Sequence, residues 1–167
     1  MEEVRETAMT YYAKLPQSHK DEATNFFESL DSDGDGKINV EEFMAWVKKR
    51  GFKSITRSER LFKELDKDEN GTLDFNEVVT LFYLNKSGRF VFCDGNGCGA
   101  FLKGNYFTCV KCFKAGTSAA GGSCDLCCSC YRDNNFNHRD DHTTFVDNYA
   151  LLLSIWRQDK PSSVELE

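Results

Sequence analysis

The sequence has no long apolar segment and no excess of positive charge. Of its 167 residues, 27 are acidic and 21 are basic, so the formal net charge is −6. Phosphate binding needs a basic surface, so we expect no nucleic-acid partner. The longest apolar run, Tyr149 to Leu153, is far shorter than the roughly 20 residues of a membrane-spanning helix. We therefore expect no membrane role either.

Targeting signals are also missing at the N-terminus. The sequence begins Met1-Glu2-Glu3, without the apolar stretch of a secretory signal. Glu2 stands where N-myristoylation requires glycine. These features predict an intracellular protein, cytoplasmic and/or nuclear.

Cysteine is absent from the first 92 residues, and all eight cysteines lie between Cys93 and Cys130. The two halves therefore carry different chemistry, and a boundary is expected at residues 86–90. The sequence predicts one domain over residues 1–86 and a second over 90–146. Residues 147–167 are expected to form a helix followed by a frayed tail. The apolar residues from Phe145 to Trp156 are spaced three to four apart, which predicts that this helix includes Phe145.

Two acidic segments in the first half, residues 31–42 and 66–77, repeat one pattern, D-x-[DN]-x-[DN]-G-x₅-E. Calcium takes six to eight oxygen ligands, which such a loop supplies from positions 1, 3, 5, 7, 9 and 12. Position 7 contributes its backbone carbonyl, and position 9 often acts through water. The predicted calcium-binding residues are Asp31, Asp33, Asp35, Lys37, Asn39 and Glu42 in loop one, and Asp66, Asp68, Asn70, Thr72, Asp74 and Glu77 in loop two.

Other positions of the two loops support a paired arrangement. Position 6 is Gly36 or Gly71, as the sharp turn there requires. Position 8 is apolar in both loops, Ile38 and Leu73, which predicts a short strand joining them.

Apolar residues at helical spacing flank both loops, which predicts an entering and an exiting helix for each. The segment Thr56-x-x-Glu59 has the pattern of a capping box and predicts the start of the second entering helix. Residues 1–15 show the same spacing, which favours a further helix packed on the pair over a free partner-binding arm.

Over about residues 20–86 the chain resembles the EF-hand superfamily, which includes calmodulin. The resemblance implies two hands sharing one apolar core, with one Ca²⁺ in each loop. Only Met44 of the three methionines lies in the paired hands, so a methionine-rich groove is not expected. The residues leave open whether the pair is a calcium sensor or a calcium buffer.

The second half carries metal-ligating residues at close spacing. Two tetrahedral zinc sites with four N or S ligands each would use eight of them and leave no open position for catalysis. Disulfides and iron–sulfur ligation are the alternatives, but the Cys-x₂-Cys pairs and the paired histidines favour zinc. The predicted zinc ligands are Cys93, Cys98, Cys109, Cys112, Cys127, Cys130, His138 and His142.

The segment resembles a ZZ-type zinc finger at Cys93-Asp94-Gly95, Tyr106 to Cys112, Asp125-Leu126-Cys127 and His138-x₃-His142. The resemblance implies interleaved sites, in which the first and third cysteine pairs share one zinc. The second cysteine pair and the two histidines share the other. The first pair is Cys-x₄-Cys rather than the usual Cys-x₂-Cys, and a Gly/Ser/Ala-rich insert spans residues 116–123.

Two further cysteines leave open which residues form the third cysteine pair. Cys124-x₂-Cys127 also has the spacing of a metal-binding pair. We prefer Cys127 and Cys130 as ligands because Asp-Leu-Cys is the local pattern of the ZZ finger, which leaves Cys124 and Cys128 as spare thiols.

ZZ fingers are binding modules, and several recognise the free N-terminus of a peptide through carboxylates. The resemblance places this role on Asp94 and Asp125, whereas Ser123 stands at a third position that is acidic in the family. The alternative for Asp94 is a turn residue that hydrogen-bonds the backbone of its own loop.

The predicted fold is thus a mainly α EF-hand pair followed by a small zinc-stabilised α+β module with cross-braced sites. The predicted function is that of a non-enzymatic calcium-binding adaptor for a protein or peptide target, such as a free N-terminus. One alternative is a calcium buffer with a purely structural zinc module. Another is a ubiquitin-ligase component, although the order of Cys and His is not that of a RING domain.

Overall fold

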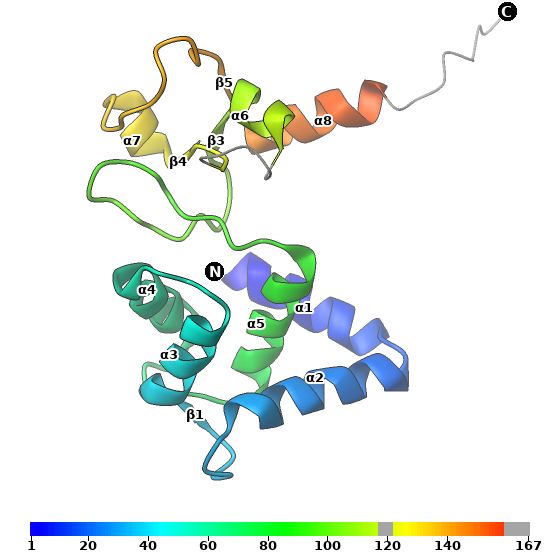
Figure 1. The fold of residues 1–167 in the computed structure, drawn as a ribbon. Coiled ribbons are helices and arrows are strands. Elements are labelled where there is room, and N and C mark those ends of the chain that lie inside the picture. Colours follow the sequence, from blue (N-terminus) through cyan, green and yellow to red (C-terminus); the bar gives the residue numbers. More distant parts are fainter. Residues whose placement is uncertain (117–121, 159–167) are drawn as a thin grey trace, which may run out of the picture. The chain divides into compact units, whose positions relative to one another are not determined.

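The computed structural model describes residues 1–116 and 122–158, and the chain divides into two compact units, Met1–Val91 and Phe92–Glu167 (Figure 1). The expected frayed tail, residues 159–167, and most of the Gly/Ser/Ala-rich insert lie outside the described residues. No helix of the described part is long and apolar enough to cross a membrane.

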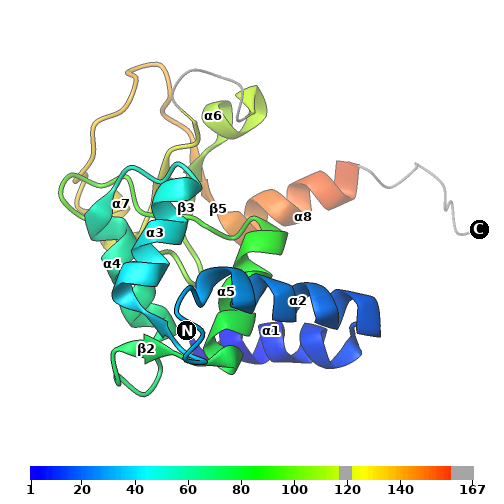
Figure 2. The same cartoon turned by 60° about the horizontal axis from the view of Figure 1, so that its bottom comes forward.

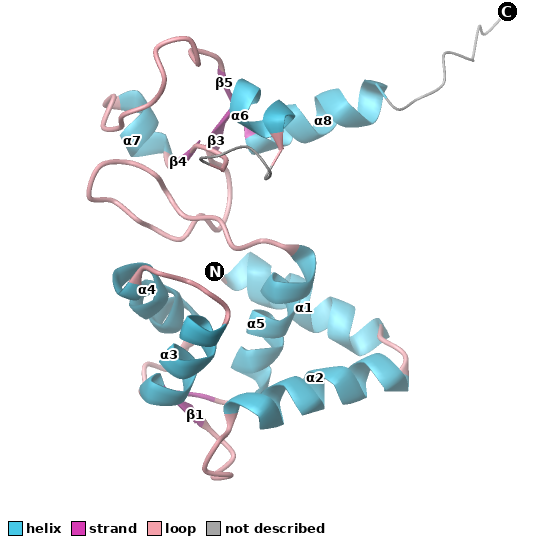
Figure 3. Ribbon diagram, in the orientation of Figure 1, coloured by secondary structure: helices cyan, strands magenta, loops and turns pink. Residues whose placement is uncertain are grey.

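Apart from its loops, unit 1, Met1–Val91, is helical with two very short strands (Figure 3). The helix predicted over residues 1–15 is present as α1, and each acidic loop is preceded by one helix and followed by another. The elements are α1 (Glu2–Lys14), α2 (Gln17–Leu30), β1 (Ile38–Asn39), α3 (Val40–Lys49), α4 (Ile55–Leu65), β2 (Thr72–Leu73) and α5 (Phe75–Ser87).

The two loops are joined as the apolar position 8 predicted. Strands β1 and β2 pair antiparallel, with Ile38 opposite Leu73. Both side chains are fully buried, and so are Phe43 and Leu65 from the helices next to the loops. The loops therefore share one hydrophobic core.

The predicted start of α4 is wrong by two residues. The N-cap is Ser54, whose hydroxyl accepts a hydrogen bond from the Arg57 N–H at 3.2 Å, and Thr56 lies inside the helix. Ser54 is the N-cap because it directly precedes the first helical residue, Ile55.

Unit 2 is built around a three-stranded antiparallel sheet in the order β4-β3-β5. Thr108 of the central strand lies opposite Asp125 on one side and Val146 on the other. The elements are β3 (Phe107–Cys109), α6 (Val110–Ala115), β4 (Asp125–Leu126), α7 (Cys128–Arg132), β5 (Phe145–Asp147) and α8 (Asn148–Gln158).

The C-terminal apolar segment is divided between a strand and a helix. Its spacing predicted a helix that includes Phe145, but Phe145 pairs with Cys109 in the sheet, and α8 starts at Asn148. The reason is packing against other segments of the chain, because the Phe145 ring contacts the rings of Phe136 and Tyr131. No residue of α8 is buried.

Candidate metal centres

Loop one brings carboxylates from both of its ends together. Asp31 follows the last residue of α2, and Glu42 lies in the first turn of α3. Carboxylate oxygens of Asp31, Asp33 and Glu42 all lie within 4.8 Å of one another. An all-oxygen cluster of this kind fits a hard cation such as Ca²⁺.

Loop two repeats this arrangement with Asp66, Asp68 and Glu77, whose oxygens also lie within 4.8 Å of one another. Asp66 follows α4, and Glu77 lies in the first turn of α5. Gly36 and Gly71 adopt left-handed backbone conformations, with φ of 82° and 83°, as predicted for position 6.

The remaining predicted calcium ligands lie in the loops but outside these carboxylate clusters. The amide groups of Lys37 and Thr72 donate to the side chains two residues before them, Asp35 and Asn70. Asn39 and Asp74 are the N-caps of α3 and α5, where each closes a capping box with Glu42 or Glu77. The patterns N-x-x-E and D-x-x-E in the sequence could have revealed these caps.

The two closing glutamates differ in their environment. Glu42 accepts hydrogen bonds from the Ser32 N–H at 2.8 Å, the Ser32 hydroxyl at 3.0 Å and the Asn39 N–H at 3.0 Å. Burial alone would raise the pKa of Glu42, but these hydrogen bonds outweigh it, and the net shift of its pKa is downward.

Glu77 accepts from the Lys67 N–H at 2.7 Å and the Asp74 N–H at 2.9 Å. Burial raises the pKa of Glu77 and is not fully offset by these two bonds. Loop two has Lys67 where loop one has Ser32, so it lacks the extra hydroxyl donor.

In unit 2 the eight predicted ligands form two groups, in the interleaved order that the resemblance implies. Within each group the ligand atoms lie within 4.8 Å of one another. The first group is Cys93, Cys98, Cys127 and Cys130, and the second is Cys109, Cys112, His138 and His142.

Backbone amides face the sulfurs of the first group. Cys93 Sγ accepts from the N–H groups of Gly95 and Cys127, both at 3.3 Å, and Cys127 Sγ accepts from the Cys130 N–H at 3.4 Å. These donors stabilise negative charge on sulfur, as a metal-bound thiolate requires. A Cβ at Gly95 would lie 2.4 Å from Cys130 Sγ, so only glycine fits beside this group.

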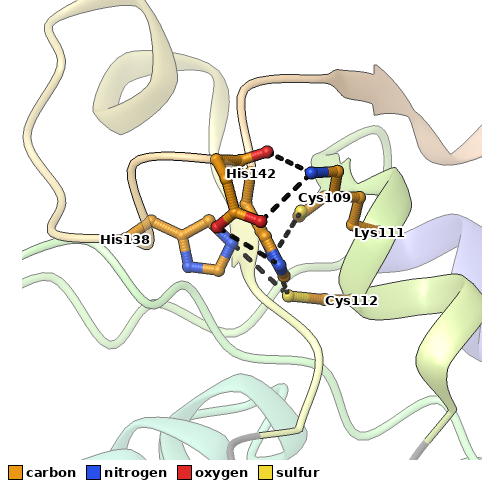
Figure 4. Close-up of polar contacts among 6 residues, drawn as sticks. Cys109, Lys111, Cys112, His138 and His142 are labelled. Carbon is orange, nitrogen blue, oxygen red and sulfur yellow. Dashed lines mark hydrogen bonds and ion pairs between the residues drawn. The ribbon is translucent and has the colours of Figure 1, made fainter.

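The second group is shown in Figure 4, where Cys109 and Cys112 face the two imidazole rings. Cys109 ends β3 and Cys112 lies in α6, whereas both histidines lie between α7 and β5. Cys112 Sγ is 3.4 Å from His138 Nε2 and 3.3 Å from His142 Nδ1, and Cys109 Sγ is 3.6 Å from His142 Nδ1.

These separations fit zinc. A tetrahedral ion with Zn–S of about 2.3 Å and Zn–N of about 2.0–2.1 Å places S and N ligands about 3.5 Å apart. The three measured distances, 3.3 to 3.6 Å, lie around this value. The donor set of two thiols and two imidazoles also fits a closed structural zinc site.

The outer side of His142 lies near a charged pair. Asp141 is paired with Lys111 of α6 at 3.2 Å, and its other carboxylate oxygen is 3.9 Å from His142 Nε2. The lysine also donates to the Asp141 carbonyl oxygen. This pair joins α6, which carries Cys112, to the segment that carries His142.

The two spare cysteines occupy different environments. Cys124 is buried within the cysteine-rich core, and burial raises the pKa of its thiol to about 12. Cys128 is exposed at the start of α7. Neither thiol belongs to a group of converging ligands among the described residues.

Asp94 and Asp125, the predicted peptide-binding residues, are held together but differ in exposure. Asp94 is exposed and accepts a hydrogen bond from the Asp125 N–H at 2.9 Å. The Asp125 side chain is buried and accepts a hydrogen bond from the Ser123 hydroxyl. Asp94 and Arg139 line a cavity of about 250 Å³ together with three members of the second ligand group, Cys112, His138 and His142.

The match to a protein-family model lies within the first unit. The family model for an EF-hand domain pair matches residues 20–83. A polcalcin, Cyn d 7 of Cynodon dactylon, is 31% identical over 61 residues, which are 36% of this chain and 76% of that protein.

Two longer relatives are matched in part. The probable calcium-binding protein CML27 of Arabidopsis thaliana is 36% identical over 78 residues, 46% of this chain and 45% of that protein. Calcium-dependent protein kinase 22 of Oryza sativa subsp. japonica is 32% identical over 109 residues, 58% of this chain but 19% of the kinase. The chain thus spans less than half the length of either of these two proteins.

Proposed function

The chain belongs to the EF-hand family, and we propose that it is a calcium sensor and adaptor whose second unit is a zinc-stabilised module for binding a protein or peptide. Calcium binding itself follows from the family and from two loops in which carboxylate oxygens converge. The sensor role, the two zinc ions and the target are the proposed parts. In this proposal the protein is not an enzyme.

The observation that carries the zinc proposal is the convergence of eight ligands in two groups of four. In each group the ligands come from two segments far apart in sequence. Zinc, when bound, would link those segments as a closed structural ion without a free coordination position. The residues of the chain supply the thiols, the imidazoles and the backbone donors to sulfur.

The cavity beside Asp94 supports a peptide-binding role. An exposed carboxylate at the edge of a 250 Å³ cavity offers an ionic partner for an amine. Because the Asp125 side chain is buried, we assign the contact with the peptide to Asp94 alone. Asp125 then acts as support, through the hydrogen bond from its N–H to the Asp94 carboxylate.

The first experiment counts metal ions by native mass spectrometry. We expect two calcium ions and two zinc ions per chain, with one zinc lost in Cys112→Ser and two calcium ions lost in calcium-free buffer. A Cys112→Ser protein that keeps two zinc ions would contradict the second site. A chain that takes up no zinc, purified under reducing conditions, would contradict the module as a whole.

The second experiment tests the target by fluorescence anisotropy. The probe is a ten-residue peptide that begins with arginine and carries a free N-terminal amine, compared with its acetylated form. We expect binding of the free form only, with the affinity reduced about 10-fold or more in Asp94→Asn. Asp133→Asn is the matched control, because Asp133 is also exposed in unit 2 but does not line the cavity.

The same measurement with and without calcium distinguishes a sensor from a buffer. A sensor predicts that calcium changes the affinity for the peptide, and a buffer predicts that it does not. Equal binding of both peptides by the wild-type protein would contradict the recognition of an amine.

A further inference from the structure

We propose that Arg5 of helix α1 is a positioning residue for calcium loop two. This inference rests on calcium binding by the loops and goes beyond it, because it assigns a role to a helix outside the EF-hand pair. Helix α1 ends at Lys14, before the family match begins at residue 20. Figure 2 shows the N-terminal end of α1 beside the loop that carries β2.

The contacts of Arg5 cap the helix that enters loop two. Its Nη2 donates to the carbonyl oxygen of Leu65 at 3.1 Å and also to that of Glu64. These are the last two residues of α4, and Asp66, the first ligand, follows directly. The last carbonyls of a helix lack partners within the helix and form its negative end, so a guanidinium there satisfies acceptors and complements the dipole.

The burial of Arg5 supports a structural role for its contact with the end of α4. The side chain is only 13% exposed, although arginine is a residue that usually reaches water. Its Nε is buried and has no hydrogen-bond partner among the described residues. A buried donor without a partner is costly, and two sets of contacts offset it: the bonds from Nη2 to the end of α4, and the ion pair of Nη1 with Glu2 at 3.0 Å.

Helix α1 is also fixed to the helix that leaves loop two. Val4 and Ala8 are buried, and α1 packs on α5. Tyr12 of α1 contacts Phe75, the first residue of α5, edge to face with ring centroids 5.9 Å apart. Glu77, the closing ligand, lies in that same first turn of α5.

Helix α1 therefore joins the two helices that deliver the first and the last ligand of loop two. A third contact, between Glu2 of α1 and Lys67 at position 2 of the loop, is 3.3 Å long. In this arrangement the oxygens of Asp66, Asp68 and Glu77 already converge. Holding the ends of the loop at this separation lowers the cost of ordering it when calcium binds.

The direction of the change in calcium affinity on removing Arg5 distinguishes positioning from a purely electrostatic effect. A positive charge near a cation site weakens binding, so removing Arg5 would strengthen calcium binding if charge alone mattered. Loss of positioning has the opposite effect. We expect Arg5→Met to raise the Kd of loop two roughly 10-fold, the low end of effects seen when groups that orient metal ligands are removed.

The experiment is a calcium titration of the full chain, loaded with zinc, followed by NMR at two amides. The Gly36 and Gly71 N–H groups donate to Asp31 and Asp66, the first ligands of their loops, each at 2.9 Å, so they report the two loops separately. Arg5→Met should shift the Gly71 midpoint by roughly 10-fold and the Gly36 midpoint by much less. Arg5→Lys, which keeps the charge and one donor nitrogen, should recover part of the affinity.

Lys14→Met is the matched control, because it removes the same charge from an exposed position of the same helix. It should leave both midpoints nearly unchanged. An unchanged or lower Gly71 midpoint in Arg5→Met, or equal shifts of both amides, would overturn the inference. If neither amide of the wild-type protein responds to calcium, the proposed function itself fails.

Discussion

The two units hold their candidate metal sites in opposite ways. In unit 1 the carboxylates lie on loops at the edge of a core made of aliphatic and aromatic side chains, such as Phe43, Leu65 and Leu81. In unit 2 the predicted ligands are themselves part of the core: Cys93, Cys109 and Cys130 are buried around Leu126. A small domain with so little buried apolar surface depends on cross-links for its stability. The difference therefore predicts which unit can fold without metal.

Removal of zinc should have the largest effect. Structural zinc contributes on the order of 10–16 kcal/mol to small domains, so unit 2 should unfold when a zinc-selective chelator is added in excess calcium. Amide signals of unit 2 should lose their dispersion in a ¹H–¹⁵N NMR spectrum, whereas those of unit 1 persist. If the signals from Cys93 to Cys130 stayed dispersed without zinc, unit 2 would not depend on metal for its fold, and the expected difference between the units would be wrong.

Substitution of Gly95 tests the same contrast at one position. In Gly95→Ala the new Cβ would lie 2.4 Å from Cys130 Sγ and 2.8 Å from Cys130 Cβ, so the first ligand group must open. We expect a loss of about 3 kcal/mol in the stability of unit 2 and weaker binding of one zinc ion, measured by thermal unfolding and by zinc competition.

Gly104→Ala is its control, because a Cβ there meets no atom within 4 Å. This variant should behave as the wild type in both measurements. Equal losses in the two variants would show that the Cys130 contact is not the cause.

Within unit 1 a smaller difference separates the two loops. The hydrogen bonds to Glu42 stabilise its ionised form, since they hold its pKa below the usual value. Burial instead raises the pKa of Glu77. In calcium-free buffer at pH 7, Glu42→Gln should therefore lower the unfolding free energy of unit 1 by about 1.5 kcal/mol, and Glu77→Gln should leave it unchanged or raise it.

The pH dependence has the matching sign. The contribution of Glu42 is present above the pKa of the unfolded chain and is lost as the pH falls through its lower folded pKa. The ionised form of Glu77 is disfavoured in the folded state, and that cost disappears as the pH falls below its raised pKa. Thermal unfolding of Glu42→Gln and Glu77→Gln, followed by circular dichroism between pH 7 and 4, checks both contributions. Equal pH profiles for these two variants would contradict the difference between Glu42 and Glu77.

Local patterns predicted most of the fold and much of the sites. Fixed spacing in the loops identified the carboxylates that converge in each loop, and the apolar position 8 predicted the Ile38–Leu73 pairing. Both depend on patterns within a single loop. The role of Arg5 could not be found in this way, since its partner Leu65 is 60 residues away and nothing near Arg5 marks it. Phe145 was misplaced for the same reason, because its partners in the sheet and the aromatic cluster lie elsewhere in the chain.

The smallest expected effect concerns the start of α4, where two hydroxyl residues compete for one role. Ser54 accepts from the Arg57 N–H and is the N-cap, although the sequence pattern favoured Thr56. Loss of an N-cap side chain costs about 1 kcal/mol, so Ser54→Ala should lower the melting temperature of unit 1 by a few degrees. Thr56→Ala should be neutral or slightly stabilising, because alanine is the better residue inside a helix. If Thr56→Ala lowered the melting temperature more than Ser54→Ala, Thr56 would be the N-cap, and α4 would start two residues later.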